Sequence, residues 1–231
     1  MKKNYTQANG ILRFLSEMNI SQALPENIAC MIPQSNPDTW KLMQEFYIKY
    51  YNDHKPRVLI FGINPGRYGG GLTGIPFTDP IRLESFCGIH NSFRKLPELS
   101  SEFVYRIIDA YGGPGTFYDQ FLFTSLSPIG FTRAGKNLNY YDDKQLRHSI
   151  SPFIEECIEW QLRNLSVMST CYCLGEGENF KYFSVLNGRK KYFREIISLP
   201  HPRWVMQYRR KKLDEYVQLY VDKLRKSSMY Q

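Results

Sequence analysis

The chain has 231 residues, of which 42% are hydrophobic and 15% aromatic, a composition typical of a globular protein large enough to bury a sizeable core. No apolar run reaches the roughly 20 residues that a membrane span needs, and the N-terminus lacks the apolar stretch of a secretory signal. We therefore expect a single domain over residues 1–231. It should be a monomer without membrane association, cytoplasmic, and located near the nucleoid in a bacterium or in the nucleus of a eukaryote.

The apolar pattern predicts helices that alternate with short buried strands. Periodicity and capping favour helices near residues 11–18, 39–51, 102–111, 151–164, from about 178, and 208–226, and the fourth of these begins at a serine cap, Ser151. Continuous apolar runs favour strands at residues 57–62, 120–128, 170–175 and 194–202. The alternation predicts an α/β fold, a three-layer α/β/α sandwich with a mainly parallel central sheet of about four strands.

Ligands of such sheets bind at the carboxyl ends of the strands. Four segments of this chain follow a predicted strand and are rich in glycine or polar residues. They are the glycine-rich stretch 62–79, TSLSP at 124–128, GEGEN at 175–179 and LPHPRW at 199–204. We expect them to converge on one site. The acids Glu176 and Glu178 in GEGEN are more simply explained as caps of the following helix than as catalytic groups.

The first of these segments reads VLIFGINPGRYGGGLTGIPFTD from residue 58 and contains six glycines. Its spacing fits neither the GxGxxG dinucleotide motif nor the P-loop, and a turn without a ligand is the simple alternative. Asn64, however, stands between Ile63 and Pro65, and the proline restricts its backbone. An amide held in one orientation can bind a water molecule through both its oxygen and its nitrogen. Asn64 is therefore a candidate for holding water at a strand end.

The net charge of +8 lies in one part of the chain. Residues 189–226 contain twelve Lys or Arg and four Asp or Glu, so the rest of the chain is balanced. Such a cluster favours a phosphate-bearing partner, and a solvated basic surface is the alternative.

These motifs resemble those of a known family. The segment GINPGRYGGGLTGIPF is similar to the first motif of the single-strand-selective monofunctional uracil-DNA glycosylases, a branch of the uracil-DNA glycosylase superfamily. LPHPRW resembles the second motif of the superfamily, and FTSLSPIGF followed by GKNLNYYD resembles the middle segment of the branch. The segments occur in the right order, and the likeness extends from about Leu12 to the final helix. The resemblance implies a DNA glycosylase without a metal or other cofactor, whose partner is single- or double-stranded DNA carrying a damaged base.

The resemblance also implies roles for particular residues. Asn64 would align the attacking water, and His201 would donate a hydrogen bond to the base carbonyl and stabilise negative charge on the departing base. Phe77 would stack on the flipped base, in a base-binding set of Gly62, Ile63, Gly66, Phe77 and Ser125. Considered without this context, His201 and Phe77 would be assigned to the core.

The segment after His201 would be the loop that meets DNA. Its side chains are bulky and apolar where the loop of the family is polar and proline-rich, so several of them could wedge into the space left by the extruded base. The residues expected to contact DNA are Arg67, Tyr68, Pro202, Arg203, Trp204, Met206, Tyr208, Arg209 and Arg210, with Val205 as a further wedge candidate. The alternative for the basic run 209–212 is the solvated start of the last helix, or an import signal.

A second departure concerns the base. The family reads the pairing edge of the base with an asparagine, where this chain has Ser125. A single hydroxyl cannot match a donor–acceptor pair as rigidly as an amide does. We therefore expect a weaker preference for uracil and action on other deaminated or oxidised bases, such as xanthine or 5-hydroxymethyluracil. Gly66 favours the latter because it leaves room for a 5-substituent.

The remaining reactive side chains give weaker signals. Five cysteines at irregular spacing predict free thiols, and Cys171 and Cys173 share one face of a strand without the further ligands of a zinc or iron–sulfur site. The first motif holds no carboxylate that could activate water, which predicts a dissociative mechanism of modest rate. Lys55 and Lys95 lie outside the motifs, so no Schiff base is expected. Two alternatives remain, a hydrolase of free nucleosides or nucleotides and a nucleic-acid-binding module that lacks turnover.

Overall fold

A computed structural model describes the backbone of residues 5–228 and the side chains of residues 5–226. The ends of the predicted 1–231 domain, residues 1–4 and 229–231, lie outside the described residues. The central element is a parallel sheet of four strands in the order β3-β2-β6-β7, which confirms the predicted sheet. Its strands are β2 (Arg57–Gly62), β3 (Phe121–Ser125), β6 (Val167–Leu174) and β7 (Glu195–Leu199).

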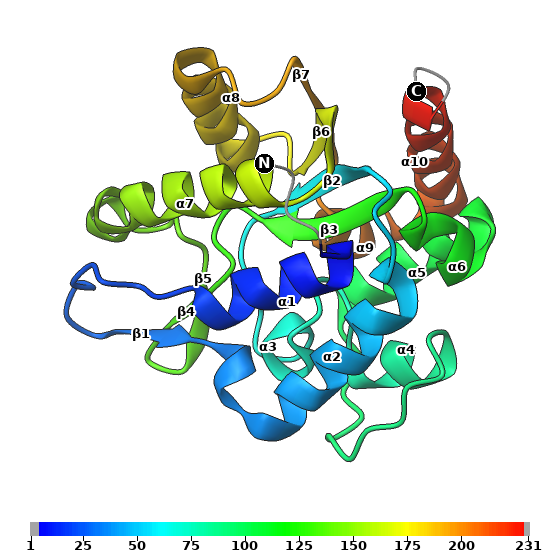
Figure 1. Ribbon diagram of the computed structural model, residues 1–231, viewed down its shortest axis with the longest axis horizontal. Helices are drawn as coiled ribbons and strands as arrows, with labels where there is room; N and C mark the ends of the chain where they lie inside the picture. Colours follow the sequence, from blue (N-terminus) through cyan, green and yellow to red (C-terminus); the bar gives the residue numbers. More distant parts are fainter. Residues whose placement is uncertain (1–4, 229–231) are drawn as a thin grey trace.

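Helices cover both faces of this sheet, as the α/β prediction requires (Figure 1). On one side, α5 (Leu99–Tyr111) packs against both α9 (Pro202–Tyr208) and α10 (Leu213–Ser228). On the other side lie α7 (Lys144–Asn164) and α8 (Glu178–Lys190). Crossovers between parallel strands are right-handed, so the direction in which the chain moves across the sheet decides which face the connecting helix covers. The chain moves one way from β2 to β3 and the opposite way from β3 to β6 and β7, so the later connecting helices lie on the other face.

The N-terminal helices α1 (Gln7–Glu17) and α2 (Pro37–Tyr51) pack against each other next to the sheet. The remaining helices are short. They are α3 (Gly70–Thr73), α4 (Pro80–Ser85), α6 (Gly113–Tyr118) and the 3-10 turns η1 (Pro33–Ser35) and η2 (Arg210–Lys212). Among the described residues, no helix is both long enough and apolar enough to cross a membrane.

A second, antiparallel sheet was not predicted. It has the order β1-β4-β5, with β1 (Ile28–Met31), β4 (Gly130–Arg133) and β5 (Lys136–Leu138). The β4–β5 hairpin turns at Ala134 and Gly135, whose φ angles of 48° and 70° suit the tight turns favoured by hairpins. Its strands are too short to give a periodic signal in the sequence, yet the hairpin borders the candidate site.

The predicted start of one helix was wrong. The helix assigned to residues 151–164 begins seven residues earlier, because Asp143 is its N-cap and accepts a hydrogen bond from the Leu146 amide at 2.9 Å. Ser151 therefore lies inside α7, where its hydroxyl donates to the Arg147 carbonyl, and Pro152 is an interior proline. The pair Ser151-Pro152 was interpreted as the start of the helix, although the actual N-cap is Asp143, earlier in the chain.

Candidate active site

The carboxyl ends of the parallel strands form a pocket of about 130 Å³, which three of the four expected segments line. The fourth segment, GEGEN at 175–179, lines the neighbouring groove instead. Asn64 from the loop after β2 and His201 from the end of β7 line it together, although 137 positions separate them in the sequence. The other lining residues are Ile63, Pro65, Gly66, Tyr68, Gly70, Pro76, Phe77, Glu98, Ser100, Ser125, Asn137, Asn139 and Arg203.

The amide of Asn64 is held by main-chain groups at the end of β5 and just after it. Its Oδ1 accepts a hydrogen bond from the Tyr140 N–H at 3.0 Å, and its Nδ2 donates to the Leu138 carbonyl at 3.2 Å. These contacts fix which end of the amide is oxygen and prevent it from rotating. One lone pair of Oδ1 remains to accept a hydrogen bond from water. The expectation that water could use both ends of the amide is therefore corrected, because Nδ2 donates to the Leu138 carbonyl and also, at 3.4 Å, to the Pro65 carbonyl.

The glycines around Asn64 serve mainly the packing of the loop itself. A Cβ at Gly71 would stand 2.5 Å from the Gly66 carbonyl oxygen, and one at Gly130 would stand 2.6 Å from the Pro65 oxygen. At these positions one stretch of main chain approaches another, rather than a ligand. Gly66 differs, because among the described residues a Cβ there would meet only the Asn137 Nδ2, at 3.4 Å, and the side facing the pocket stays open.

Phe77 has a strained backbone conformation, and its ring packs closely against the end of β2. Its φ of 54° lies in the left-handed region, which costs a non-glycine residue about 1–2 kcal/mol. The Thr73 hydroxyl donates to the Thr78 carbonyl at 2.7 Å and holds the turn in this shape. The ring lies directly over the end of β2, since a Cβ at Gly62 would stand 2.8 Å from it and 3.3 Å from the Ser125 hydroxyl. Gly62 is therefore the buried support of the ring rather than a part of the pocket lining.

His201 occupies the N-cap of α9. Its Nδ1 accepts a hydrogen bond from the Arg203 N–H at 3.2 Å, so the proton of the neutral ring is on Nε2. Burial, together with the nearby Arg203 charge, lowers the pKa of His201 to about 4. The ring is thus neutral near pH 7. Its centroid lies 6.3 Å from that of Phe77, which leaves the two rings on neighbouring walls of one pocket.

The segment predicted as a DNA-meeting loop is a helix. Pro202, Val205 and Met206 are buried in α9 and pack into the core, so they cannot contact or wedge into DNA, and these assignments were wrong. The helical repeat of 3.6 residues turns this face inward and leaves the other face in solvent. On the outer face, Trp204 and Tyr208 are 37% and 65% exposed.

A wide groove of about 760 Å³ continues from the pocket. Its walls carry aromatic and cationic side chains from three separate segments: Arg67 and Tyr68, Lys136 and Tyr141, and Arg203, Trp204 and Tyr208. A fourth segment adds the carboxylates of Glu176 and Glu178. The Arg67 guanidinium stacks on the Tyr68 ring, 4.9 Å from its centroid, and its buried Nε has no hydrogen-bond partner among the described residues. Arg209 covers one face of Trp204 in the same way, at 4.7 Å.

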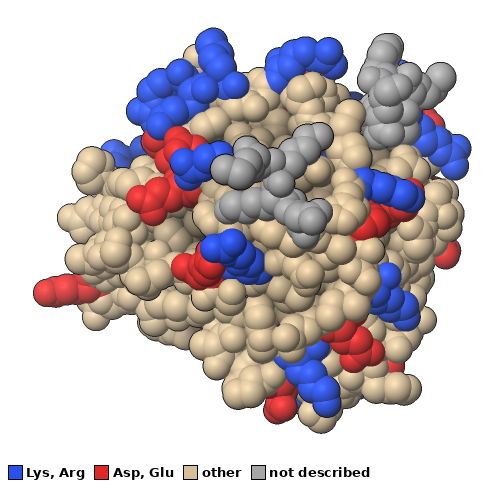
Figure 2. All heavy atoms as spheres, in the orientation of Figure 1, with Lys and Arg blue, Asp and Glu red and all other residues tan. Residues whose placement is uncertain are grey.

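The basic third of the sequence does not form one patch. At the end of α8, Arg189 and Lys190 pair with Glu155, and Lys190 also pairs with Glu159, so that basic and acidic side chains mix there (Figure 2). Lys212 pairs with Glu215. Of the cations in this third of the chain, Arg203 lines the groove, and Arg209 lies over the ring of Trp204, which also lines it. The prediction of a phosphate-binding surface therefore applies to these few residues and to Arg67, not to the whole C-terminal third.

Several lining residues were missed by sequence reasoning. Glu98 lines the pocket and is the N-cap of α5, where its Oε2 accepts from the Ser101 N–H at 3.2 Å. Burial, together with the nearby Asp79 carboxylate, raises its pKa. Among the residues that the structure describes, it is the only carboxylate in the pocket lining. The motif GKNL, noted only as a likeness, supplies Asn137, and no pattern pointed to Glu98 because its position depends on how α5 docks.

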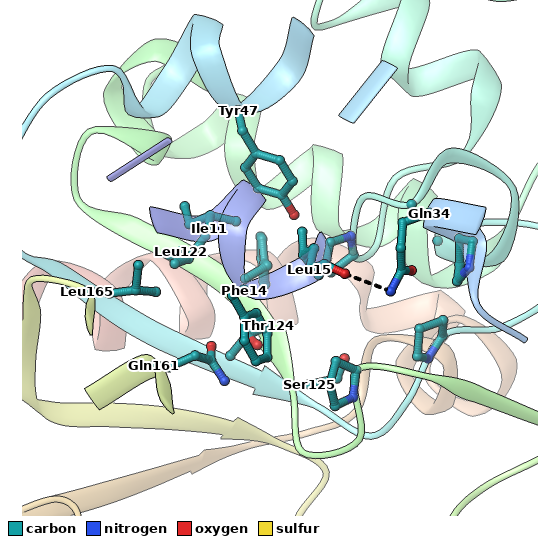
Figure 3. A pocket seen from close by; sticks show the side chains of 17 residues that line it. Ile11, Phe14, Leu15, Gln34, Tyr47, Leu122, Thr124, Ser125, Gln161 and Leu165 are labelled. Carbon is teal, nitrogen blue, oxygen red and sulfur yellow. Dashed lines mark hydrogen bonds between the residues drawn. The ribbon is translucent and has the colours of Figure 1, made fainter. Parts of the chain in front are cut away.

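A smaller cavity of about 40 Å³ (Figure 3) adjoins the pocket, since the two linings share Pro65, Gly70, Pro76 and Ser125. Ile11, Phe14, Leu122 and Leu165 line it, and Ser125 lies at its edge on β3. Gln34 also lines the cavity and donates to the Leu15 carbonyl at 3.1 Å. The cavity has room for a water molecule but none for a base. Ser125 is therefore part of the wall that closes the pocket toward the core.

Other candidate groups lie away from the site. The five cysteines are free thiols, and Cys173 accepts a hydrogen bond from the Asn179 amide at 3.3 Å inside the core. No group of three His, Cys, Asp or Glu residues in the described part of the chain could hold a metal ion. Lys55 pairs with Asp119 and Lys95 with Glu84, and neither lysine lines the pocket.

An amide, a neutral imidazole and an aromatic ring that line one pocket at the carboxyl ends of a parallel sheet match the family expected from the motifs. The sequence profile of the uracil DNA glycosylase superfamily matches residues 48–225, and the chain belongs to this superfamily. Its structure is similar to the crystal structure of wild-type Pedobacter heparinus SMUG2. The two share 41% identity over 96% of this chain and 98% of that chain, with a TM-score of 0.94. A search of curated proteins found no significant match.

Proposed function

We propose that the chain is a monofunctional DNA glycosylase of base excision repair. It would hydrolyse the N-glycosidic bond of a flipped deaminated or oxidised base and leave an abasic site. The observation that carries this proposal is the placement of Asn64 and His201 on one pocket whose mouth opens into an aromatic and cationic groove. Membership of the uracil DNA glycosylase superfamily supports it.

The proposed chemistry uses both walls of the pocket. The base leaves with the electron pair of the glycosidic bond, and the neutral His201 donates Nε2–H to the carbonyl oxygen on which negative charge develops. Water bound to the free lone pair of Asn64 Oδ1 then adds to C1′ of the sugar cation and loses its proton to solvent. Asn64 positions this water without deprotonating it, so bond cleavage precedes attack. Phe77 supplies a stacking surface worth about 1–3 kcal/mol.

The groove supports DNA as the substrate rather than a free nucleoside. The pocket alone would serve a nucleoside, but it leaves the exposed side chains of Trp204 and Tyr208 without a function. Aromatic faces and free cations along one groove are the features that bind the bases and phosphates of a single strand. Of the bases, we propose uracil with a relaxed preference, extending to xanthine and 5-hydroxymethyluracil, because the base-reading position is Ser125.

The test is release of the base from defined oligonucleotides. Wild type and Asn64→Ala are incubated with single- and double-stranded DNA that carries uracil, xanthine or 5-hydroxymethyluracil, and alkali then cleaves the abasic sites. Strand cleavage by wild type that falls about 10²-fold or more in Asn64→Ala is expected. Binding without cleavage would identify a DNA-binding module instead, and turnover of free nucleosides alone would identify a nucleoside hydrolase.

A further inference from the structure

A buried polar link connects the residue that holds Asn64 to the end of β6. Tyr140, whose N–H donates to Asn64 Oδ1, has a fully buried side chain. Its hydroxyl donates to Asn179 Oδ1 at 3.0 Å. The Asn179 Nδ2 in turn donates to the Leu174 carbonyl at 3.1 Å and to the Cys173 Sγ at 3.3 Å. A continuous chain of hydrogen bonds therefore leads from the amide of Asn64 to a strand of the parallel sheet.

The link joins the two walls of the pocket. The main chain that holds Asn64 follows β5, an edge strand of the separate antiparallel sheet. The strand β6, by contrast, is the neighbour of β7, whose end carries His201, and the Gly175 N–H donates to the Leu199 carbonyl at 2.8 Å there. Asn179 and Tyr140 thus tie the main chain behind the first wall to the sheet that carries the second wall.

A hydrogen bond fixes what ring packing leaves free. The Tyr140 ring packs against the rings of Tyr141 and Tyr182, with centroids 5.1 Å and 5.3 Å apart. Apolar contacts of this kind are not directional, so a ring can shift and keep them. The bond to Asn179 requires a definite distance and direction, and breaking it would leave buried polar groups without partners. The main chain of Tyr140 therefore keeps its place relative to β6, and so does Asn64 Oδ1.

We propose that Tyr140 and Asn179 are positioning residues, which hold the water-binding amide of Asn64 in place relative to His201 through the end of β6. The inference rests on the proposed glycosylase function. Neither side chain touches the substrate, because both are buried and neither lines the pocket. They act on the place of the attacking water, and so on the rate of base release rather than on the binding of DNA.

The informative variant is Tyr140→Phe, because it removes the hydroxyl and keeps both the ring and the main-chain N–H. Asn179→Ala breaks the link from its other end. Tyr182→Phe is the matched control. Its hydroxyl donates to the Ser151 hydroxyl at 3.2 Å and its ring packs against Tyr140, so the control loses a hydroxyl of the same cluster that is not bonded toward Asn64.

The first readout is single-turnover release of uracil from a single-stranded oligonucleotide. We expect about a tenfold slower release in Tyr140→Phe and in Asn179→Ala at unchanged DNA affinity, and the wild-type rate in Tyr182→Phe. Combined with Asn64→Ala, neither variant should slow release further, because the position of the amide matters only while the amide is present. An equal loss with and without Asn64 would show a merely structural role and overturn the inference.

The second readout is hydrogen exchange, which does not depend on activity. In Asn179→Ala, the Tyr140 N–H should exchange about tenfold faster relative to the Leu126 N–H, which donates to the Gly62 carbonyl at 3.0 Å in the parallel sheet. Unchanged relative exchange would overturn the positioning role whatever the rates of release. If wild type released no base at all, the proposed function would fail, and exchange would still decide whether the link holds Asn64.

Discussion

The two walls of the pocket are held in different ways. Asn64, on the first wall, is fixed by main-chain groups of Leu138 and Tyr140, which lie 74 and 76 positions away. His201, on the second wall, is fixed by the main-chain N–H of Arg203 in its own helical turn and by burial. The amide therefore depends on the whole tertiary structure around the hairpin, whereas the imidazole depends on a local helix cap. Substitutions remote from the site should disturb the orientation of Asn64 on the first wall, and changes in pH should alter the protonation of His201 on the second.

The largest effect is expected for removing the donor of the second wall. His201→Ala should lower single-turnover release of uracil by about 10²–10³-fold, because the negative charge on the departing base loses its preorganised N–H. His148→Ala, at an exposed histidine outside the pocket, is the matched control and should change nothing. A loss of less than tenfold in His201→Ala would mean that the second wall does not stabilise the leaving base.

The next effect concerns the buried support of the first wall. In Gly62→Ala, the new methyl group would stand 2.8 Å from the Phe77 ring and displace it from its stacking position. Because small misplacements of a reacting group cost about 10²-fold, we expect a loss of that order in base release. Gly188→Ala serves as control, since nothing lies within 4 Å of that Cβ and the helix tolerates alanine. Equal behaviour of the two variants would contradict the role of Gly62.

A pH effect on stability should come from the second wall. The pKa of His201 is lowered from 6.5 to about 4, so between these values the unfolded chain binds a proton that the folded protein does not. The free energy of unfolding should therefore decrease as the pH falls from about 6.5 to about 4, by roughly 1–2 kcal/mol at this partly accessible ring. Urea unfolding at pH 7 and pH 4.5 should give a smaller difference in His201→Gln than in wild type. The same difference in both proteins would disprove the link.

The smallest effect tests whether the hairpin supports the first wall. Gly135 has a φ of 70°, so Gly135→Val should strain the β4–β5 turn by about 1–2 kcal/mol. The main chain that holds Asn64 follows this turn directly, and we expect base release to fall by up to roughly tenfold at a temperature where the variant stays folded. Ala134→Gly, which relieves a φ of 48°, should keep full activity. Unchanged activity in Gly135→Val would show that the amide does not depend on the hairpin.

Local patterns in the sequence predicted much of this protein. The apolar runs located all four strands of the parallel sheet, and the two motifs located Asn64 and His201 at strand ends. Both kinds of pattern can be recognised from residues that are close together in the sequence. The helix at 202–208 was read as a loop since a seven-residue helix beginning with proline gives little periodic signal. For this reason Met206, which the helix buries, was predicted to contact DNA.

The sequence by itself determined the sheet, the order of the segments that meet at its edge and the residue types available there. Only the tertiary structure decided that Asn64 offers a single lone pair, that Glu98 and Asn137 join the pocket, and that the basic third is divided among ion pairs and the groove. The physical reason is the range of the interactions. Strands and helices follow from neighbours a few residues apart, whereas the hydrogen bonds that orient an amide and the packing that exposes or buries a side chain come from segments that meet only when the chain has folded.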